Sequence, residues 1–180
     1  MSATPERPSQ KLIQHFKMEK IPAEGPWFAV TYRSQDRLDA KSLPLRYQGD
    51  RIASTAIYAV QTMEDFSAMH KLLTDEIWHF YGGNPLEMLL LYPDGRGEVV
   101  VVGPDVFKGQ HPQFVVSRDV WQGSIPMGAG PESYSFFGNT LAPGFEFDDF
   151  EMGYRDELQN QYPQFAGHIG RLTREEFKSR

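Results

Sequence analysis

The sequence contains no cysteine, so both a disulfide framework and a thiolate metal site are excluded. It also lacks long apolar segments, because the longest strongly apolar stretch, Met88 to Leu91, is far too short to cross a bilayer. Residues 1–10 are polar, contain two prolines and have no apolar run of the kind found in signal peptides. We therefore expect a soluble, cytoplasmic protein with no membrane partner.

Positive charge is also scarce, with 18 Lys and Arg against 24 Asp and Glu and a formal net charge of −6. No basic stripe stands out, so we expect no nucleic-acid partner. The segment Gly128-Ala129-Gly130 lacks the lysine and the following helix of a phosphate-binding loop. No serine has the context of a nucleophile elbow, so a hydrolase triad is not indicated.

Aromatic residues, in contrast, are plentiful at 13% of the 180 residues, and they could fill a wide β-core or line a pocket. The length suits one domain with a good hydrophobic core. We expect a disordered tail over residues 1–8 and a single domain over residues 9–180.

Many short segments of β-branched and aromatic residues, about ten residues apart and separated by turn residues, indicate a mainly β fold of the sandwich or barrel type. The expected strands are Trp27–Tyr32, Ile52–Val60, Phe66–His70, Glu76–Tyr81, Leu86–Tyr92, Glu98–Val102, Phe114–Val116, Trp121–Ser124, Ser133–Asn139 and Phe145–Phe150. Residues 34–50 are polar and are expected to form a loop.

Short helices are expected at both ends of the chain. Ser9 could cap one that runs through Lys20, and Arg155–Gln161 and Arg174–Ser179 fit two more. No helix long enough to connect parallel strands fits between the expected strands, which argues against an α/β architecture.

Several segments resemble the fifth cupin family, a set of small single-domain proteins of largely unassigned function. The segments that carry the resemblance are Phe66–His70, Asp75–Tyr81, Leu141–Glu151, Glu24-Gly25, Thr31–Ser34, Ser54–Tyr58 and Trp121–Gly123. The resemblance covers about residues 10–173. It implies an antiparallel cupin-type jelly-roll β-barrel with a ligand pocket inside, usually paired as a homodimer. Related barrels include epimerases, dioxygenases, isomerases and binding proteins, so the fold alone does not give the function.

The resemblance also allows the usual cupin metal ligands, three His and one Glu, to be compared with this sequence. His70 and Glu76 match the first His and the Glu, but Leu72 stands at the second His position and Gln122 at the last. Leucine cannot donate, and glutamine is a weak neutral donor. We expect no firmly bound metal and no other cofactor, leaving at most a weak divalent-metal site at His70, Glu76 and Gln122.

The candidate catalytic residues are Glu76, which shares a strand face with Trp78 and Phe80, and His70. A carboxyl group among aromatic rings would have a raised pKa, as an acid or base near neutral pH requires. The candidate ligand-binding residues are Tyr58, Trp78, His79, Phe80 and Gln122. For Trp78 and Phe80 the default interpretation is a core position, and for His79 it is a structural histidine on the outer face of the strand. His70 could equally be a structural histidine satisfied by hydrogen bonds.

The acidic residues of the last expected strand, Glu146, Asp148, Asp149 and Glu151, alternate with phenylalanines. This pattern favours a strand with one face in solvent, and the alternative is a hydrogen-bonding rim at the mouth of the barrel.

Three functions remain open. The first is binding of a small polar, carbohydrate-like ligand with metal-independent epimerase or isomerase chemistry. The second is a binding module without chemistry, and the third is a metal-dependent oxygenase or isomerase. The partners expected are the small-molecule ligand and a second copy of the chain.

Overall fold

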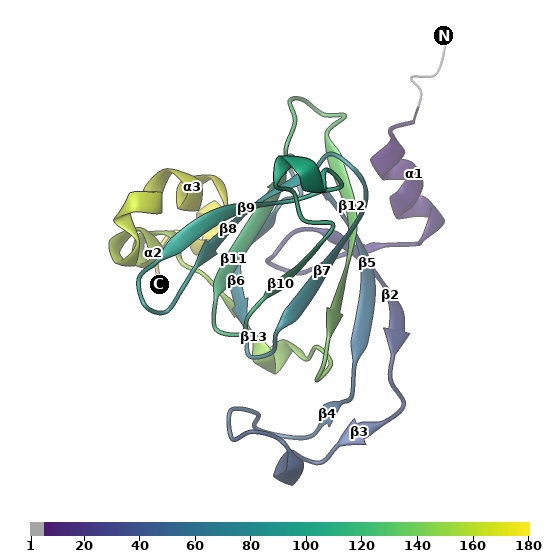
Figure 1. Ribbon diagram of the computed structural model, residues 1–180, viewed down its shortest axis with the longest axis vertical. Helices are drawn as coiled ribbons and strands as arrows, with labels where there is room; N and C mark the ends of the chain where they lie inside the picture. Colours follow the sequence, from purple (N-terminus) through teal and green to yellow (C-terminus); the bar gives the residue numbers. More distant parts are fainter. Residues whose placement is uncertain (1–5) are drawn as a thin grey trace.

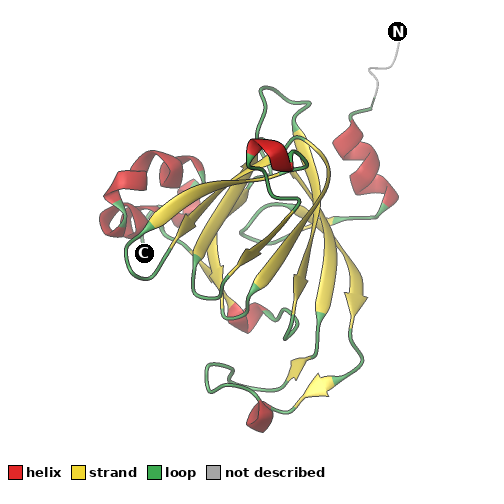
Figure 2. Ribbon diagram, in the orientation of Figure 1, coloured by secondary structure: helices red, strands yellow, loops and turns green. Residues whose placement is uncertain are grey.

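The computed structural model describes residues 6–180, and the expected mainly β fold is confirmed (Figures 1 and 2). Residues 1–5 of the expected N-terminal tail lie outside the described part. Two antiparallel sheets face each other as in a jelly roll, without closing into one hydrogen-bonded barrel.

The larger sheet has the strand order β1-β2-β5-β12-β7-β10. Its strands are β1 (Glu19–Lys20), β2 (Trp27–Arg33), β5 (Thr55–Thr62), β7 (Glu76–Gly83), β10 (Gln113–Val116) and β12 (Tyr134–Leu141). The smaller sheet has the order β13-β6-β11-β8-β9. Its strands are β6 (Ser67–Leu72), β8 (Leu86–Leu91), β9 (Gly97–Val102), β11 (Trp121–Pro126) and β13 (Phe150–Met152).

The expected loop over residues 34–50 is partly ordered into an arm that extends from one end of the sheets (Figure 1). It contains β3 (Arg37–Leu38), which pairs with β4 (Arg51–Ile52), and the 3-10 turn η1 (Ala40–Ser42). Arg51 anchors the arm, because its guanidinium group binds both carboxylate oxygens of Asp149 at 2.6 and 2.7 Å while both side chains are buried.

The N-terminal helix α1 (Pro8–His15) is shorter than expected. Arg7 rather than Ser9 is its N-cap, and Ser9 is buried inside the first turn. The helix stops because Lys17 adopts a left-handed backbone (φ 51°), after which Glu19 and Lys20 pair with β2. The expected helix through Lys20 is therefore wrong in its second half.

The C-terminal helices also differ from the expectation. Helix α2 (Arg155–Gln161) lies as expected, whereas α3 (Ala166–Arg171) was not expected, since two glycines lower its helix propensity. Burial of Ile169 and Leu172 against the smaller sheet offsets that weakness. Residues 174–179 form only the 3-10 turn η5 (Glu175–Phe177) instead of a helix. The remaining short turns are η2 (Val106–Lys108), η3 (Phe147–Asp149) and η4 (Pro163–Phe165).

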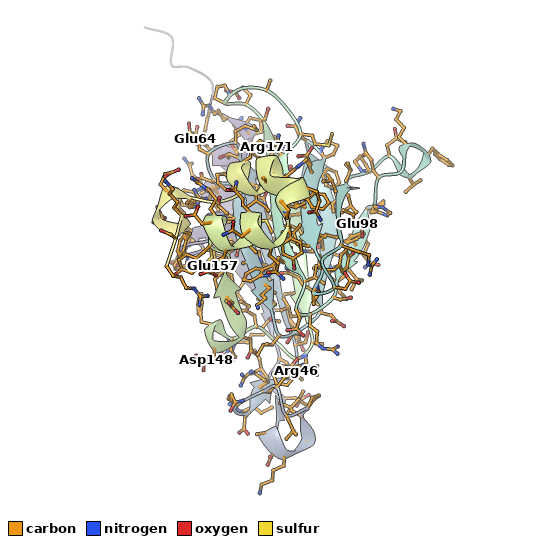
Figure 3. All side chains as sticks on the ribbon, turned by 90° about the vertical axis from the view of Figure 1, so that its left-hand side faces the viewer. Arg46, Glu64, Glu98, Asp148, Glu157 and Arg171 are labelled. Atoms are coloured by element: carbon orange, nitrogen blue, oxygen red, sulfur yellow. The ribbon has the colours of Figure 1, made fainter. Side chains whose placement is uncertain are left out.

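The hydrophobic core has two parts. One lies between the sheets and includes Trp78, Met88 and Phe137, and the other lies between the smaller sheet and the C-terminal helices and includes Met69 and Tyr162. Figure 3 shows these helices, which carry Glu157 and Arg171, in front of the sheet. Within residues 6–180, none of the helices combines the length and the apolar character that a membrane crossing requires.

Candidate functional site

A cavity of about 290 Å³ lies between the inner faces of the sheets, at the end of the molecule where β2 and β12 finish. This is the lower end in Figure 1, from which the arm extends. Most of the wall is apolar and aromatic. The polar side chains in the wall are Glu24, Arg33, Thr55, His70, Glu76, Asn139 and Glu146.

Glu76, the first residue of β7, faces the cavity and is only 8% exposed. Its Oε2 accepts hydrogen bonds from Nε2 of Gln122 at 2.7 Å and from Nε1 of Trp78 at 3.1 Å. Both donors point at the same oxygen, so a proton bound by this carboxyl group belongs on Oε1.

Burial raises the pKa of Glu76 to about 7, because the charged form loses its hydration. A positive charge on His70 would lower this pKa, the nearby Glu24 raises it, and the hydrogen bonds from Gln122 and Trp78 lower it. The carboxyl group therefore exchanges its proton near neutral pH, the range in which a general acid or base works best.

His70 lies on β6 opposite Gln122 of β11, and its ring stacks on Phe150 at a centroid distance of 5.2 Å. Its Nδ1 is 2.8 Å from the backbone oxygen of Ala68. A carbonyl oxygen can only accept, so Nδ1 carries the hydrogen and the neutral ring keeps its lone pair on Nε2. His70 can thus take up a proton at Nε2 without losing the contact that orients it.

Glu24 approaches the same histidine from the segment between β1 and β2. Its Oε1 accepts a hydrogen bond from Oγ of Ser67 at 2.6 Å and lies 4.0 Å from Nδ1 of His70. The Ser67 hydroxyl group therefore holds the Glu24 carboxylate beside the Nδ1 edge of the His70 ring.

Four of the expected site residues come together. His70, Glu76 and Trp78 line the cavity, and Gln122 lies directly behind them with 1% exposure. Both ends of the Gln122 amide are in use, since Oε1 accepts from Nε1 of Trp78 at 3.0 Å and Nε2 donates to Glu76. Gln122 therefore positions Glu76 rather than contacting a ligand itself.

The other three expected ligand-binding residues lie away from the cavity. Tyr58 stands between Ile57 and Ala59, which line the cavity, so strand alternation turns it to the outer face, where it packs on Phe16, Tyr81 and Phe136.

His79 is turned outward in the same way and lies 3.1 Å from Oγ1 of Thr140. Burial lowers its pKa. Phe80 does face inward, but it lies farther along β7, where it packs against the core between the sheets rather than in the cavity wall.

Several residues of the site were not expected from the sequence. Asn139 and Phe137 of β12 line the cavity, and the ring of Phe137 stacks on Trp78 at 4.8 Å with an angle of 18°. Strand alternation places Asn139 on the same face as Phe137 and Leu141, and this polar residue on an apolar face was the signal that could have identified it. Glu24 lies in a segment without periodicity, so no local pattern could have placed it.

The prediction that the acidic segment around residues 146–151 forms one strand with a solvent-facing side is wrong. Residues 147–149 form η3, Asp149 is buried against Arg51, and Glu146 joins the cavity wall, where it binds Arg33 at 3.1 Å. Asp148 and Glu151 do lie at the surface. The strand begins only at Phe150, because the ion pair with Arg51 holds the preceding turn.

The residues of the site do not fit the metal centre that related barrels suggest. Leu72 lies in the cavity wall and has no donor atom, and the amide of Gln122 is already hydrogen-bonded at both ends. Of the four positions that hold the metal in such barrels, only those of His70 and Glu76 keep a free donor atom, one short of the three protein ligands of a typical catalytic site. Within residues 6–180, no group of three or more His, Cys, Asp or Glu residues has an arrangement that could hold a metal ion.

Comparison with known proteins gives consistent results. A family model described as "Cupin superfamily (DUF985)" matches residues 10–153. An uncharacterized protein of Saccharomyces cerevisiae is 29% identical over 181 residues, which cover 94% of this chain and 89% of that protein.

Two solved structures are also similar. A protein from Shewanella oneidensis, solved by X-ray crystallography, has a TM-score of 0.81 at 28% identity, covering 94% of this chain and 99% of that one. A hypothetical protein from Leishmania major has a TM-score of 0.79 at 28% identity, covering 92% of this chain and 98% of that one.

Proposed function

The chain belongs to the cupin superfamily family DUF985, and from this premise we propose that its cavity binds a small carbohydrate-like molecule and catalyses metal-independent proton transfer on it, as an epimerase or isomerase does. The observation that carries the proposal is the buried carboxyl group of Glu76, whose pKa is raised to about 7 and whose Oε1 makes no hydrogen bond to Gln122 or Trp78. An acid of this kind is half protonated at neutral pH.

The two side chains would act as a pair. Nε2 of His70 removes a proton from the carbon next to a substrate carbonyl group, and Oε1 of Glu76 gives its proton to the carbonyl oxygen, which leaves a neutral enol. The protonated Nε2 of His70 then returns its proton to the former carbonyl carbon, and the other hydroxyl group of the enediol gives its proton to Oε1 of Glu76, which yields the ketose isomer of an aldose and restores both side chains. Trp78, stacked on Phe137, would exclude water from one side of the reacting carbon atoms.

The proposal is tested by incubating the protein in D₂O near pH 7 with a panel of free aldoses, namely pentoses, hexoses and 6-deoxyhexoses. We expect deuterium to replace the hydrogen next to the carbonyl carbon of at least one sugar, seen as loss of its proton NMR signal. Glu76→Gln should slow the exchange by about 100-fold or more, because an amide cannot supply the proton.

The matched control is Glu64→Gln, which removes an exposed carboxylate from the loop between β5 and β6. Figure 3 shows Glu64 at the end of the molecule opposite Arg46 and Asp148, far from the mouth of the cavity. Exchange that is absent with every sugar, or that Glu76→Gln leaves unchanged, would refute the enzymatic proposal. A sugar that binds and is recovered unchanged, with His70→Ala weakening only its binding, would instead favour a binding module without chemistry.

We also propose that the chain forms a homodimer through the outer face of the larger sheet. Tyr32, Tyr81 and Val115, on β2, β7 and β10 of this sheet, are 54%, 49% and 52% exposed, and large apolar side chains exposed on one face favour association. Light scattering at micromolar concentration should give about twice the chain mass of 20.6 kDa. The double variant Tyr81→Glu/Val115→Glu should give the mass of one chain, and a monomeric wild-type protein would rule out the dimer.

A further inference from the structure

The charge of the cavity limits which ligands can enter it. Three carboxyl groups belong to its wall, those of Glu24, Glu76 and Glu146, and Arg33 is the one Lys or Arg among the described lining residues. The guanidinium of Arg33 is already paired with Glu146 at 3.1 Å. A phosphate or carboxylate inside the cavity would lose its hydration without gaining a free cation in return.

One donor in the wall has no partner. Asn139 is 4% exposed and lies on β12 between Ile57 of β5 and Trp78 of β7. Among residues 6–180, its Nδ2 is a buried side-chain atom that makes no hydrogen bond. Leaving a buried amide donor unpaired is unfavourable, and buried polar groups in proteins are nearly always paired. Nδ2 is enclosed in this orientation, but a half-turn of the amide about its Cβ–Cγ bond exchanges the positions of Nδ2 and Oδ1, so that the donor can meet an acceptor of a ligand in the cavity.

The surroundings of Asn139 define the rest of the ligand. Its neighbour Trp78 stacks on Phe137, and both belong to the cavity wall, so the surface beside the amide is aromatic and favours an apolar ring. His70 and Glu76 are two further polar residues of the cavity wall that a ligand beside Asn139 can contact.

We propose that Asn139 is the specificity-determining residue of this cavity: its Nδ2 donates a hydrogen bond to the carbonyl oxygen of an uncharged cyclic ligand, and molecules that would carry an anionic group into the cavity are rejected. This inference rests on the proposed function in taking the cavity as the ligand site. It narrows the carbohydrate-like substrates to unphosphorylated, uncharged ones.

The test uses two probes of nearly the same shape, acetophenone and benzoate, with toluene as a ring that lacks an acceptor. Binding to the full chain is measured at pH 8 by titration with amide chemical shifts as the readout. Acetophenone should bind in the millimolar range, as its size allows, and benzoate at least about tenfold more weakly. Asn139→Leu should weaken acetophenone binding about tenfold and leave toluene binding unchanged.

The control variant is Thr140→Val, which changes the next residue on β12. Its hydroxyl group contacts His79 on the outer face, so acetophenone binding should not change. Thermal unfolding gives a second readout. Asn139→Leu should raise the Tm if the amide is unpaired in the free protein, whereas a structural role for Asn139 would require the Tm to fall.

Three results would overturn the inference: no binding of acetophenone to the wild-type protein, equal binding of benzoate, or unchanged acetophenone binding by Asn139→Leu. These results can be distinguished from a failure of the proposed acid–base chemistry. If acetophenone binds as expected but no sugar exchanges deuterium, the acid–base proposal is refuted and the role of Asn139 is supported. If exchange occurs but benzoate binds as well as acetophenone, only the role of Asn139 falls.

Discussion

Replacement of Asp149 by leucine is expected to lower the free energy of unfolding by about 3–5 kcal/mol, because it leaves the guanidinium group of Arg51 buried without a counter-charge. Arg51 and Asp149 are each 5% exposed, and their two hydrogen bonds are 2.6 and 2.7 Å long. Backbone oxygens of Gly49 and Asp50 would remain as partners of Arg51, but neither carries a full negative charge. Urea unfolding followed by tryptophan fluorescence measures the loss.

The double variant Arg51→Met/Asp149→Leu separates charge from packing. Once both charges are gone, apolar side chains of similar size should recover most of the lost stability, since a buried ion pair often contributes little more than a well-packed apolar pair. A single variant that loses less than about 1 kcal/mol would show that water reaches Arg51. The interpretation of this pair as a buried anchor of the arm would then be wrong.

The second large effect is a stabilisation that depends on pH. The pKa of Glu76 is raised from 4.5 to about 7 in the folded protein. Its contribution to stability is therefore complete below pH 4.5 and is lost as the pH rises through 7, because the folded state binds the proton more tightly than the unfolded state. Each pH unit between the two pKa values is worth about 1.4 kcal/mol, so wild-type protein should lose about 3 kcal/mol between pH 4.5 and pH 8.

Glu76→Gln removes this loss, since the amide oxygen can accept the same hydrogen bonds from Gln122 and Trp78 and never ionises. The variant should match wild-type protein at pH 4 and exceed its free energy of unfolding by about 3 kcal/mol at pH 9. Denaturant titrations at the two pH values test this, with Glu64→Gln as the exposed control that should show little difference. Equal stability of Glu76→Gln and wild-type protein at pH 9 would mean that the carboxylate is hydrated.

The inward placement of side chains that the sequence predicted depends on local periodicity. Glu76 and Trp78 share an inward face because alternation along one strand is a property of that strand alone. Alternation could not place Tyr58 in the same way, because β5 carries apolar residues on both of its faces. No local pattern in the sequence of β5 therefore showed which of its residues face the cavity.

The parts that could not be predicted depend on contacts between distant segments. The pairing of Arg51 with Asp149 joins residues 98 positions apart, and it turned an expected strand into η3. Glu24 reaches Ser67 across 43 positions from a segment without periodicity. Asn139 follows the alternation of β12, but its unpaired amide is visible only once the neighbouring strands are in place.

The C-terminal helices determine when the cavity can be completed during synthesis. The backbone N–H of Met69 donates to the oxygen of Leu172 at 2.8 Å, and the Met69 side chain packs under these helices while the next residue, His70, faces the cavity. A nascent chain that has reached only residue 153 would leave the outer face of β6 uncovered, with Met69, Leu89 and Leu91 exposed. We therefore expect β6, the strand that carries His70, to become fixed only after Leu172 has left the ribosome, so that the cavity depends on a segment synthesised well after the strands that line it.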